Sequence, residues 1–420
     1  MFILSHPTGN AFVRAAARAL HTSGRLHAFH TTVVAPRLEW PAPAGPMRRL
    51  LSRRRFDEIP RRLIRTHPWR ESVRLLAPTI GLNRLSRKGA WAGIDAVYEQ
   101  FDRDVAAEIG RLPARDSVAG VYGYEDASVH TFRSARSLGL TCVYELPIAH
   151  WATTQRLLRE EADRLPAWRP TLRGIDDPDE KLERKALELE LADAIFVPSR
   201  FVLETLPPAI LTGKPCLVAP FGSPFPHADD RRVRQPTDRL RVLFAGAMTQ
   251  RKGLADLFAA MKLVDRSDVE LVVMGSPLAP MSFYRGQCPG FVYEGPRSHD
   301  EVLSLMRTCD VLALPSIVEG RALVQQEALA SGLPLLVTPN AGGEDLVEQG
   351  KTGFLVPIRA PAVLAERITW FADHRSALVA MRQAAKAKAL ATGWAQYERR
   401  LGEAVSVATH RRCRVDSCAS

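Results

Sequence analysis

Short apolar runs alternate with helical stretches along the first half of the chain. An apolar run of four to eight residues is typical of a buried strand, whereas apolar positions three and four apart indicate a helix. Strand-like runs occur at FIL, LHAFHTTVV, AGVYGY, CVYELP and AIFVPS, and helical patterns such as AFVRAAARALHTSG, VHTFRSARSLG and DEKLERKALELELAD lie between them. This alternation predicts a mostly parallel sheet that is covered by helices on both faces.

The segment PFGSPFPHADDRRVRQPTDR interrupts this pattern with four prolines and a cluster of charges, which is typical of a linker. The alternation then restarts with RVLFAGA, VELVVMG, FVYEG, DVLALPS, PLLVTP and GFLVP. We therefore predict an α/β protein with two doubly wound, Rossmann-like domains at residues 1–225 and 240–385. The linker is expected at 226–239, and a C-terminal helix at 386–410. In such sheets ligands bind beyond the carboxyl ends of the strands, so two facing domains would form a cleft.

Length and composition agree with a globular protein of this size, since the chain has 420 residues, 46 % hydrophobic and 25 % charged. No apolar run reaches the roughly 18 residues that cross a bilayer, and MFILSHPTGN lacks the features of a signal peptide. We therefore expect an intracellular, cytoplasmic and soluble protein. The six cysteines form no CxxC pair, which favours reduced thiols over a zinc site or a disulfide framework.

The net charge of +11 is concentrated in one segment, because residues 48–74 carry ten arginines against three acidic residues. Apolar residues between the arginines favour a helix with one apolar side. Such a helix could be a solvated basic face, or it could bind anionic lipid headgroups or a phosphorylated substrate. A peripheral position on the inner face of the membrane therefore stays open. We do not expect nucleic acid as a partner, because no recognition motif for it accompanies the basic segment.

Two strands of the second domain lead into loops with candidate chemistry. RVLFAGA runs into MTQRKG, which places Arg251 and Lys252 in a turn and Gly253 at the start of a helix. The free N–H groups and partial positive charge of a helix N-terminus, together with two cations, favour a diphosphate. The glycine-lysine-serine spacing of a Walker loop is absent from this turn.

DVLALPS runs into IVEGRALVQQEALASG, where Glu319 lies in the turn and a helix is expected from about residue 321 to Gly332. Glu327 would then lie roughly 7 Å along the helix axis from its start. There it could accept two hydrogen bonds from a ribose diol, while backbone N–H groups at 321–323 bind phosphate oxygens and Glu319 faces the attached group. Alternatively, Glu327 is only an exposed helix residue.

The combination of FAGAMTQRKG, VYEGPRSHDEV and ALPSIVEGRALVQQEALASGLPLLVTPNAGGEDLVEQGKTGFLVP resembles the donor-binding half of the retaining glycosyltransferase family 4, which has the GT-B fold. The two glutamates match the E-x7-E signature of that family, and HPTGN looks like its glycine-containing first loop. The resemblance implies retaining, metal-independent sugar transfer from a nucleoside diphosphate sugar to a saccharide or lipid-linked acceptor, without a cofactor. Cell-surface polysaccharide, lipopolysaccharide or glycolipid synthesis would be its setting, and the C-terminal helix would cross back to the first domain.

The resemblance also implies roles for particular residues. The implied catalytic residues are His150, Glu319 and Lys252. The implied donor-binding residues are Gly246, Arg251, Lys252, Arg297, Gly320, Arg321, Ala322, Leu323 and Glu327. The implied acceptor-side loop contains His6, Gly9 and Asn10. Two departures from the family concern this set: Gly246-Ala247 stands where many members have Gly-Arg, and Gly320-Arg321-Ala322 stands where many have Gly-Phe-Gly.

Several questions about residues and function stay open in the sequence. The cluster of Tyr122, Tyr124 and Glu125 could line the acceptor side or cap a strand. The DxD element at Asp177 and Asp179 is interpreted as acids at a helix start rather than as a metal site. Two rivals to a transferase are a sugar-nucleotide epimerase of the same fold and a non-catalytic, membrane-associated binding protein. The donor base, expected to be read near Pro296 to His299, and the acceptor are not readable from the sequence.

Overall fold

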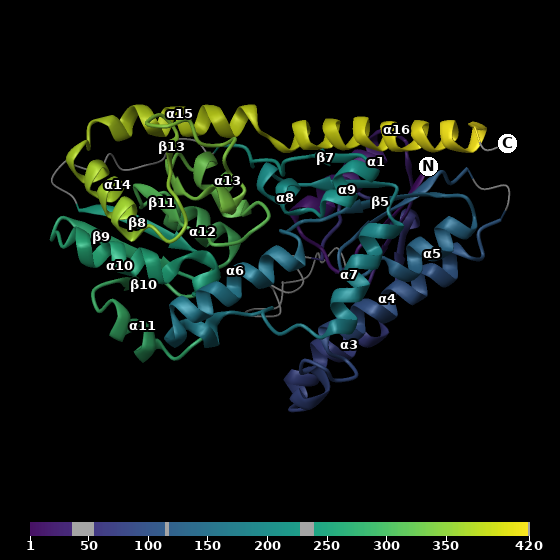
Figure 1. The fold of residues 1–420 in the computed structure, drawn as a ribbon, viewed down its shortest axis with the longest axis horizontal. Helices are drawn as coiled ribbons and strands as arrows, with labels where there is room; N and C mark the ends of the chain where they lie inside the picture. The colour runs from purple at the N-terminus through teal and green to yellow at the C-terminus, as the bar shows by residue number, and fades with distance from the viewer. Residues whose placement is uncertain (36–53, 114–116, 227–238, 419–420) are drawn as a thin grey trace.

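The computed structural model describes residues 1–35, 54–113, 117–226 and 239–418. These residues form two α/β domains that lie side by side, the N-terminal one in purple to teal and the C-terminal one in green (Figure 1). Each domain is built on one sheet whose described strands pair in parallel, as the alternation of strands and helices predicts. Residues 227–238, which make up nearly all of the predicted linker, lie outside the described part of the chain.

The N-terminal sheet has seven strands in the order β3-β2-β1-β4-β5-β6-β7. The strands are β1 (Phe2–Ser5), β2 (Leu26–Thr31), β3 (Ile64–Thr66), β4 (Gly120–Tyr124), β5 (Thr141–Glu145), β6 (Ala194–Val197) and β7 (Cys216–Val218). The helices are α1 (Ala11–Thr22), α3 (Trp69–Leu76), α4 (Ile94–Ile109), α5 (Val129–Ser137), α6 (Trp151–Arg164), α7 (Asp179–Leu191), α8 (Arg200–Thr205) and α9 (Pro208–Gly213). All residues of β4 and β5 are buried, as expected for parallel strands with both faces covered.

The C-terminal sheet has six strands in the order β10-β9-β8-β11-β12-β13. The strands are β8 (Leu240–Ala245), β9 (Val269–Met274), β10 (Val292–Tyr293), β11 (Val311–Leu314), β12 (Leu335–Val337) and β13 (Gly353–Leu355). The helices are α10 (Leu254–Val264), α11 (Met281–Gln287), α12 (His299–Met306), α13 (Leu323–Ala330), α14 (Pro361–Asp373), α15 (Ala377–Ala391) and α16 (Trp394–Cys418). The strand order reverses between β8 and β11, which is where a ligand site is expected in a doubly wound sheet.

The basic segment differs from the expectation of one amphipathic helix, and its residues 48–53 lie outside the described part. Residues 61–63 form a 3₁₀ turn, residues 64–66 form the edge strand β3, and a helix begins only at Trp69. Pro60 and Pro68 flank these elements, and proline cannot donate the backbone hydrogen bond that a continuous helix interior requires. The helix prediction is therefore wrong for residues 54–68, whereas residues 69–74 are helical and belong to α3.

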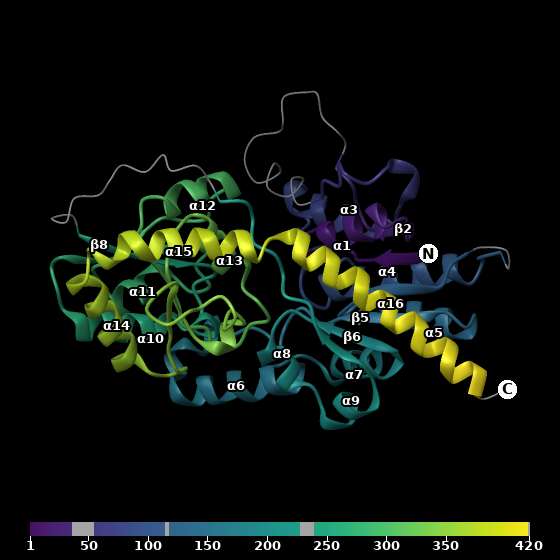
Figure 2. The same cartoon turned by 90° about the horizontal axis from the view of Figure 1, so that it is seen from above.

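The C-terminal helix crosses back to the N-terminal domain, but it begins at Trp394 rather than at residue 386. The chain breaks the helix at Thr392 and Gly393, and α16 then runs across the N-terminal domain (Figure 2). The break is held by Ser223, whose N–H donates to the Thr392 carbonyl (2.8 Å). Just after the break, in the first turn of α16, the Tyr397 hydroxyl lies 3.2 Å from both carboxylate oxygens of Glu145 at the end of β5. Helix α16 thereby covers the N-terminal sheet.

No helix in the four described ranges has both the length and the apolar character needed to cross a bilayer. Cys142, Cys216, Cys288 and Cys309 are free thiols, as their spacing predicts.

Candidate functional site

The loops after β8 and β11 meet at the switch point of the C-terminal sheet, and three predicted site residues lie together there. Glu319 Oε1 is 2.5 Å from Lys252 Nζ and 2.8 Å from a guanidinium nitrogen of Arg251. Two cations from one loop thus converge on one carboxylate from the other. The predicted diphosphate clamp and the first of the two predicted glutamates are therefore one ionic cluster.

Backbone contacts fix the two loops against each other. The Ile317 N–H donates to the Arg251 carbonyl (2.9 Å), and the Arg251 guanidinium donates to the Val318 carbonyl (3.2 Å). Gly253 has a φ of +74°, and a Cβ at this position would lie 1.9 Å from the Pro315 carbonyl oxygen. A glycine is therefore required at the start of α10 for the backbone to approach the β11 loop this closely.

Gly246 makes room for the clamp lysine. Its φ is +149°, and an added Cβ would lie 2.8 Å from Lys252 Cδ. The lysine side chain therefore passes directly over the glycine on its way to Glu319. The structure assigns Gly246 a steric part in the site, since it lets the lysine lie close to the strand end.

The charges of this cluster are set by competition between burial and pairing. Burial acts to raise the pKa of Glu319, but Lys252 and then Arg251 outweigh it and lower the pKa to about 2. Burial lowers the pKa of Lys252 against the attraction of Glu319. Glu319 is therefore ionised at neutral pH, so it can accept hydrogen bonds or attract cations but has no proton to donate.

Glu327 lies on α13, as predicted, with its carboxylate beside the start of α12. Its Oε1 is 3.5 Å from His299 Nδ1. Burial raises the pKa of Glu327 to about 7. The second glutamate thus adjoins the segment from Pro296 to His299, where the donor base is expected to be read. Arg297 from that segment forms an ion pair with Glu294.

Two of the residues at the start of α13 already form hydrogen bonds within the C-terminal domain. The Arg321 side chain is buried and bound to Asp345, with oxygen–nitrogen distances of 2.5 and 3.1 Å. The Ala322 N–H donates to the Ala341 carbonyl (3.2 Å). The N–H group of Ala322, one of the three predicted to bind phosphate, therefore already donates to a carbonyl of the same domain. Leu323 is the first residue of the helix.

His150 and Glu319 lie on loops that touch across the domain boundary. A Cβ on Gly320 would lie 1.7 Å from the Pro147 carbonyl oxygen, and Ser199 Oγ donates to the Gly320 carbonyl (2.8 Å). His150 caps α6, and its Nδ1 accepts from the Ala152 N–H at 3.4 Å. Burial, followed by the charge of Lys185, lowers the pKa of His150 to about 4, so the ring is neutral.

The acceptor-side loop is built largely from local contacts. His6 is buried and stacks edge-on against Tyr124, with ring centroids 4.8 Å apart. Burial lowers its pKa to about 4. Asn10 caps α1 by accepting from the Val13 N–H (2.9 Å), and Gly9 is buried just before it. Asn10 therefore has a structural partner, whatever it also contacts in a complex.

Tyr122 and Glu125 of the aromatic and acidic cluster bind other residues of the N-terminal domain, and the DxD element stands at the start of a helix. The Tyr122 hydroxyl donates to Glu145 (2.6 Å) inside the N-terminal core, and Glu125 pairs with Lys185 (3.1 Å). Asp179 lies in the first turn of α7, as the interpretation of the DxD element requires. Asp177 precedes α7, and its Oδ2 lies 3.5 Å from Nζ of Lys181 on that helix.

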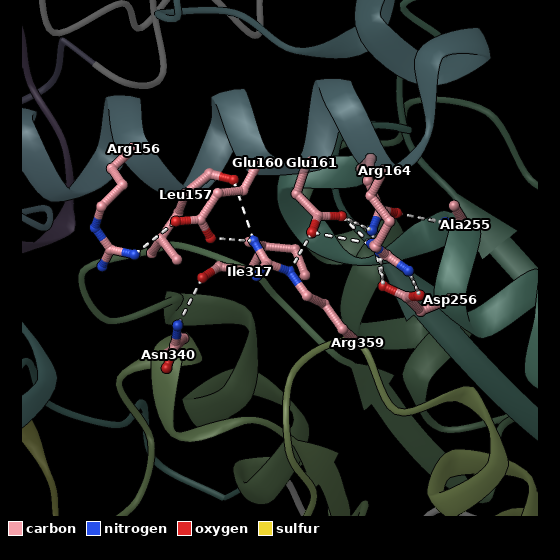
Figure 3. Close-up of polar contacts among 11 residues, drawn as sticks. Arg156, Leu157, Glu160, Glu161, Arg164, Ala255, Asp256, Ile317, Asn340 and Arg359 are labelled. Atoms are coloured by element: carbon pink, nitrogen blue, oxygen red, sulfur yellow. Dashed lines mark hydrogen bonds and ion pairs between the residues drawn. The ribbon is translucent and has the colours of Figure 1, made fainter.

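Helix α6 is the main feature that sequence reasoning missed. It follows β5 of the N-terminal domain, yet it lies on the C-terminal domain (Figure 3). Its fully buried Glu161 contacts Arg164 (2.6 Å), Gln250 (2.7 Å) and Arg359. Arg164 in turn binds both oxygens of Asp256 at 2.8 Å. No motif signals this contact, because an amphipathic helix pattern does not specify which domain it packs on.

Helix α6 therefore links the two halves of the candidate site. His150 lies at its N-terminus, and near its C-terminus Glu161 holds Gln250, the residue before Arg251. The Gln250 side chain also donates to Asp256 (2.8 Å) and accepts from the Ala255 N–H (2.8 Å). The position of the clamp thus depends on a helix from the other half of the sequence.

Comparison with known proteins agrees with this geometry. Residues 227–388 match the glycosyl transferases group 1 family. The chain is 26 % identical to a D-inositol 3-phosphate glycosyltransferase of Corynebacterium efficiens over 64 % of this chain and 68 % of that protein. It is 31 % identical to a protein of the same description from Streptomyces scabiei, but the match covers only 44 % of this chain and 45 % of the relative.

Solved structures show the same architecture over the whole chain. Sucrose-phosphate synthase of Thermosynechococcus elongatus covers 100 % of this chain and 99 % of its own, with a TM-score of 0.61 and 18 % identity. HepE of Anabaena, solved with UDP-glucose, covers 97 % and 99 %, with a TM-score of 0.61 and 16 % identity. The predicted GT-B fold of two Rossmann-like domains is therefore confirmed. The family match and the relatives support a glycosyltransferase and do not favour an epimerase or a binding protein.

Proposed function

We propose that this protein is a retaining, metal-independent glycosyltransferase that uses a nucleoside diphosphate sugar and acts on a saccharide or lipid-linked acceptor in cell-envelope glycan synthesis. The observation that carries the proposal is the convergence of Arg251 and Lys252 on Glu319 at the switch point of the C-terminal sheet. Two cations held on a rigid loop suit a leaving diphosphate. A relative described as a colanic acid biosynthesis glycosyltransferase, 29 % identical over 34 % of this chain, supports the envelope setting.

The proposed reaction is a front-face substitution at the anomeric carbon of the donor sugar. The bond from that carbon to the diphosphate oxygen breaks, the acceptor hydroxyl attacks on the same face, and its proton passes to the departing phosphate. Arg251 and Lys252 neutralise the charge that develops on the diphosphate, and this preorganised electrostatic stabilisation is the main catalytic contribution.

The remaining groups position the donor sugar. Glu319, ionised in the free enzyme, holds the two cations in place and accepts hydrogen bonds from sugar hydroxyls. The contact of His150 Nδ1 with a backbone N–H favours the tautomer protonated at Nε2, so the neutral ring can donate a hydrogen bond to the sugar. Glu327 accepts from the ribose diol of the nucleotide.

Donor binding tests the proposal through Glu327→Gln. We expect one nucleoside diphosphate among UDP, GDP and ADP to raise the melting temperature of the wild type in the presence of EDTA, and the variant to lose most of this rise. A ligand at about 100 times its dissociation constant adds roughly 2.7 kcal/mol. Because burial raises the pKa of Glu327 to about 7 and the diol needs the ionised carboxylate, nucleotide affinity should fall as the pH drops below 7. The variant should show no such dependence.

The same substitution controls for folding. An acid with a raised folded-state pKa stabilises the fold below its ordinary pKa, and this contribution is lost as the pH rises towards the folded value. Glutamine keeps the shape without the charge, so the variant should be at least as stable as the wild type above pH 7. The exposed Glu366→Gln on α14 serves as the matched control.

Product analysis by NMR separates the rival functions. A transferase gives a product with retained anomeric configuration, an epimerase alters the donor itself, and a binding protein gives neither.

A peripheral membrane position is part of the proposal. The segment 69–94 of the N-terminal domain carries half of the exposed large hydrophobic side chains of the described residues. They are Trp69, Leu76, Ile80, Leu82, Leu85, Trp91 and Ile94, with Trp69 72 % and Ile80 68 % exposed. Arg84 and Arg87 are exposed among them. Apolar side chains flanked by cations suit an anionic lipid surface, and this segment takes the place of the helix predicted for residues 48–74.

Vesicle binding tests this surface. We expect the protein to bind anionic vesicles at low salt, to lose binding at high salt, and not to bind neutral vesicles. Arg84→Ala with Arg87→Ala should weaken binding by about 30-fold, at about 1 kcal/mol for each cation. Leu263→Ser on α10, also exposed but on the other domain, should bind like the wild type. No binding to either kind of vesicle would remove the membrane from the proposal, and equal binding to both would remove the role of Arg84 and Arg87.

A further inference from the structure

Two buried histidines and two carboxylates meet on the β2–β3 side of the N-terminal sheet. His30 lies on β2, His67 directly follows β3, and Asp104 and Glu108 lie one turn apart on α4. His30 Nδ1 and His67 Nε2 are 3.0 Å apart, and the rings stack with centroids at 5.3 Å. The His30 side chain is 3 % exposed and that of His67 is 8 % exposed. None of these residues takes part in the donor site proposed above.

A carboxylate completes the group. Glu108 places one oxygen 3.9 Å from His30 Nδ1 and the other 3.7 Å from His67 Nε2. The nitrogen and oxygen atoms all lie within 4.8 Å of one another. Tetrahedral zinc, with ligand distances of about 2.0–2.1 Å, separates its ligand atoms by roughly 3.3 Å. One Glu108 oxygen must approach both nitrogens, so a side-chain shift of up to about 1.5 Å would bring all three groups into zinc coordination, with the fourth position left to water.

A second carboxylate lies behind one of the ligands, roughly 1 Å beyond hydrogen-bond distance. Asp104 Oδ2 lies 4.0 Å from the other ring nitrogen of His67, and Gln100 holds Asp104 through a 2.8 Å hydrogen bond. A carboxylate behind a histidine commonly directs its free nitrogen to a metal ion. Glu108 is 43 % exposed, so an ion can enter from solvent. The nearby cation Arg65 is turned to the Arg62 carbonyl (2.8 Å).

We propose that His30, His67 and Glu108 bind one divalent transition-metal ion, of which Zn²⁺ fits best, and that Asp104 positions His67. Two imidazoles and one carboxylate form a set of ligands suited to this ion. The ion ties β2, the end of β3 and α4 together. It also fixes the chain two residues before Trp69, where the exposed apolar segment begins. The proposal does not depend on the glycosyltransferase assignment, because its ligands and its readout are separate from donor turnover.

The test uses the full chain after removal of metal by a chelator. Titration with Zn²⁺ should give one equivalent bound at micromolar concentration, and Co²⁺ in its place should give the intense visible absorption of a four-coordinate ion. Glu108→Gln, at a half-exposed position that folding tolerates, and His67→Gln should each weaken binding at least 100-fold. Asp104→Asn should weaken it by about 10–100-fold, as loss of an orienting carboxylate does.

The control is His374→Gln, because His374 is an exposed histidine on the other domain whose ring contacts the Trp370 carbonyl of its own helix. This variant should bind like the wild type. Circular dichroism of each metal-free variant separates loss of a ligand from loss of fold. The proposal is overturned if the wild type binds no zinc at micromolar concentration, or if the folded Glu108→Gln and His67→Gln proteins bind it as the wild type does. The two histidines would then form only a hydrogen bond.

Discussion

Replacing Lys252 with alanine is expected to lower kcat by about 100-fold or more, which is the cost of removing one preorganised group from a charge-stabilising site. The lysine lies 2.5 Å from Glu319 and only 13 % of its side chain is exposed, so mobile cations in solvent are poorly placed to replace it. The fold should survive, because Arg251 at 2.8 Å leaves the Glu319 carboxylate paired. The test is steady-state kinetics with sugar donors of the nucleotide that the binding experiment identifies, with the donor affinity measured separately.

The matched control for this variant is Lys262→Ala, an exposed lysine near the end of the adjoining helix α10. It should turn over at the wild-type rate. A Lys252→Ala protein that is folded and within a few-fold of wild-type kcat would show that the clamp does not need the lysine. The proposed part of this residue in leaving-group stabilisation would then be wrong.

Glu161→Ala is expected to lower the free energy of unfolding by about 3 kcal/mol, the lower end of the cost of breaking a buried ion pair, because Asp256 and Glu160 still pair with the two arginines. Glu161 is fully buried and contacts Arg164 and Arg359 (Figure 3). Its partner Gln250 would also lose the contact that fixes the loop before Arg251. Unfolding in urea measures the first effect, and nucleotide affinity measures the second.

The neighbouring residue supplies the control. Glu160 is on the same helix, also pairs with Arg359 (2.9 Å), and is 38 % exposed. Exposed pairs of this kind contribute about 0–1 kcal/mol, so Glu160→Ala should have little effect. Equal losses from the two substitutions would mean that burial of the Glu161 network is not what holds α6 to the C-terminal domain.

The predictable part of this protein is the part in which each signal is local. The alternation of strands and helices determines both sheets, and the loops after β8 and β11 carry their chemistry within a few residues of the strand ends. These loops can be located without knowing that Lys252 is buried against Glu319. The helix boundaries at Gly253 and Gly332 can also be predicted from the sequence. Both positions have positive φ values, which glycine adopts most easily, so a glycine in the pattern indicates where the helix begins or ends.

The unpredictable part depends on contacts between distant segments. Edge strand β3 has the sequence IRT within the arginine-rich segment, so it presents no apolar run that would indicate a strand. The break between α15 and α16 occurs where Gly393 pairs with Ser223, a partner from the other side of the linker. The buried acid Glu161 resembles a surface residue in the sequence, because Gln250 and Arg359, which bury it, lie 89 and 198 positions away.

The placement of α6 also has a consequence for how the protein is made. Glu161 and Arg359 are separated by 198 positions. At a synthesis rate of ~5–20 residues per second, Arg359 leaves the ribosome roughly 10–40 s after Glu161. During that interval the N-terminal sheet can form, but α6 has no domain to pack on and its acidic residues remain hydrated. The nascent chain therefore contains a folded N-terminal sheet while α6 is still unpacked. The loop of Arg251 and Lys252 can reach its final geometry only after nearly the entire C-terminal domain has been synthesised.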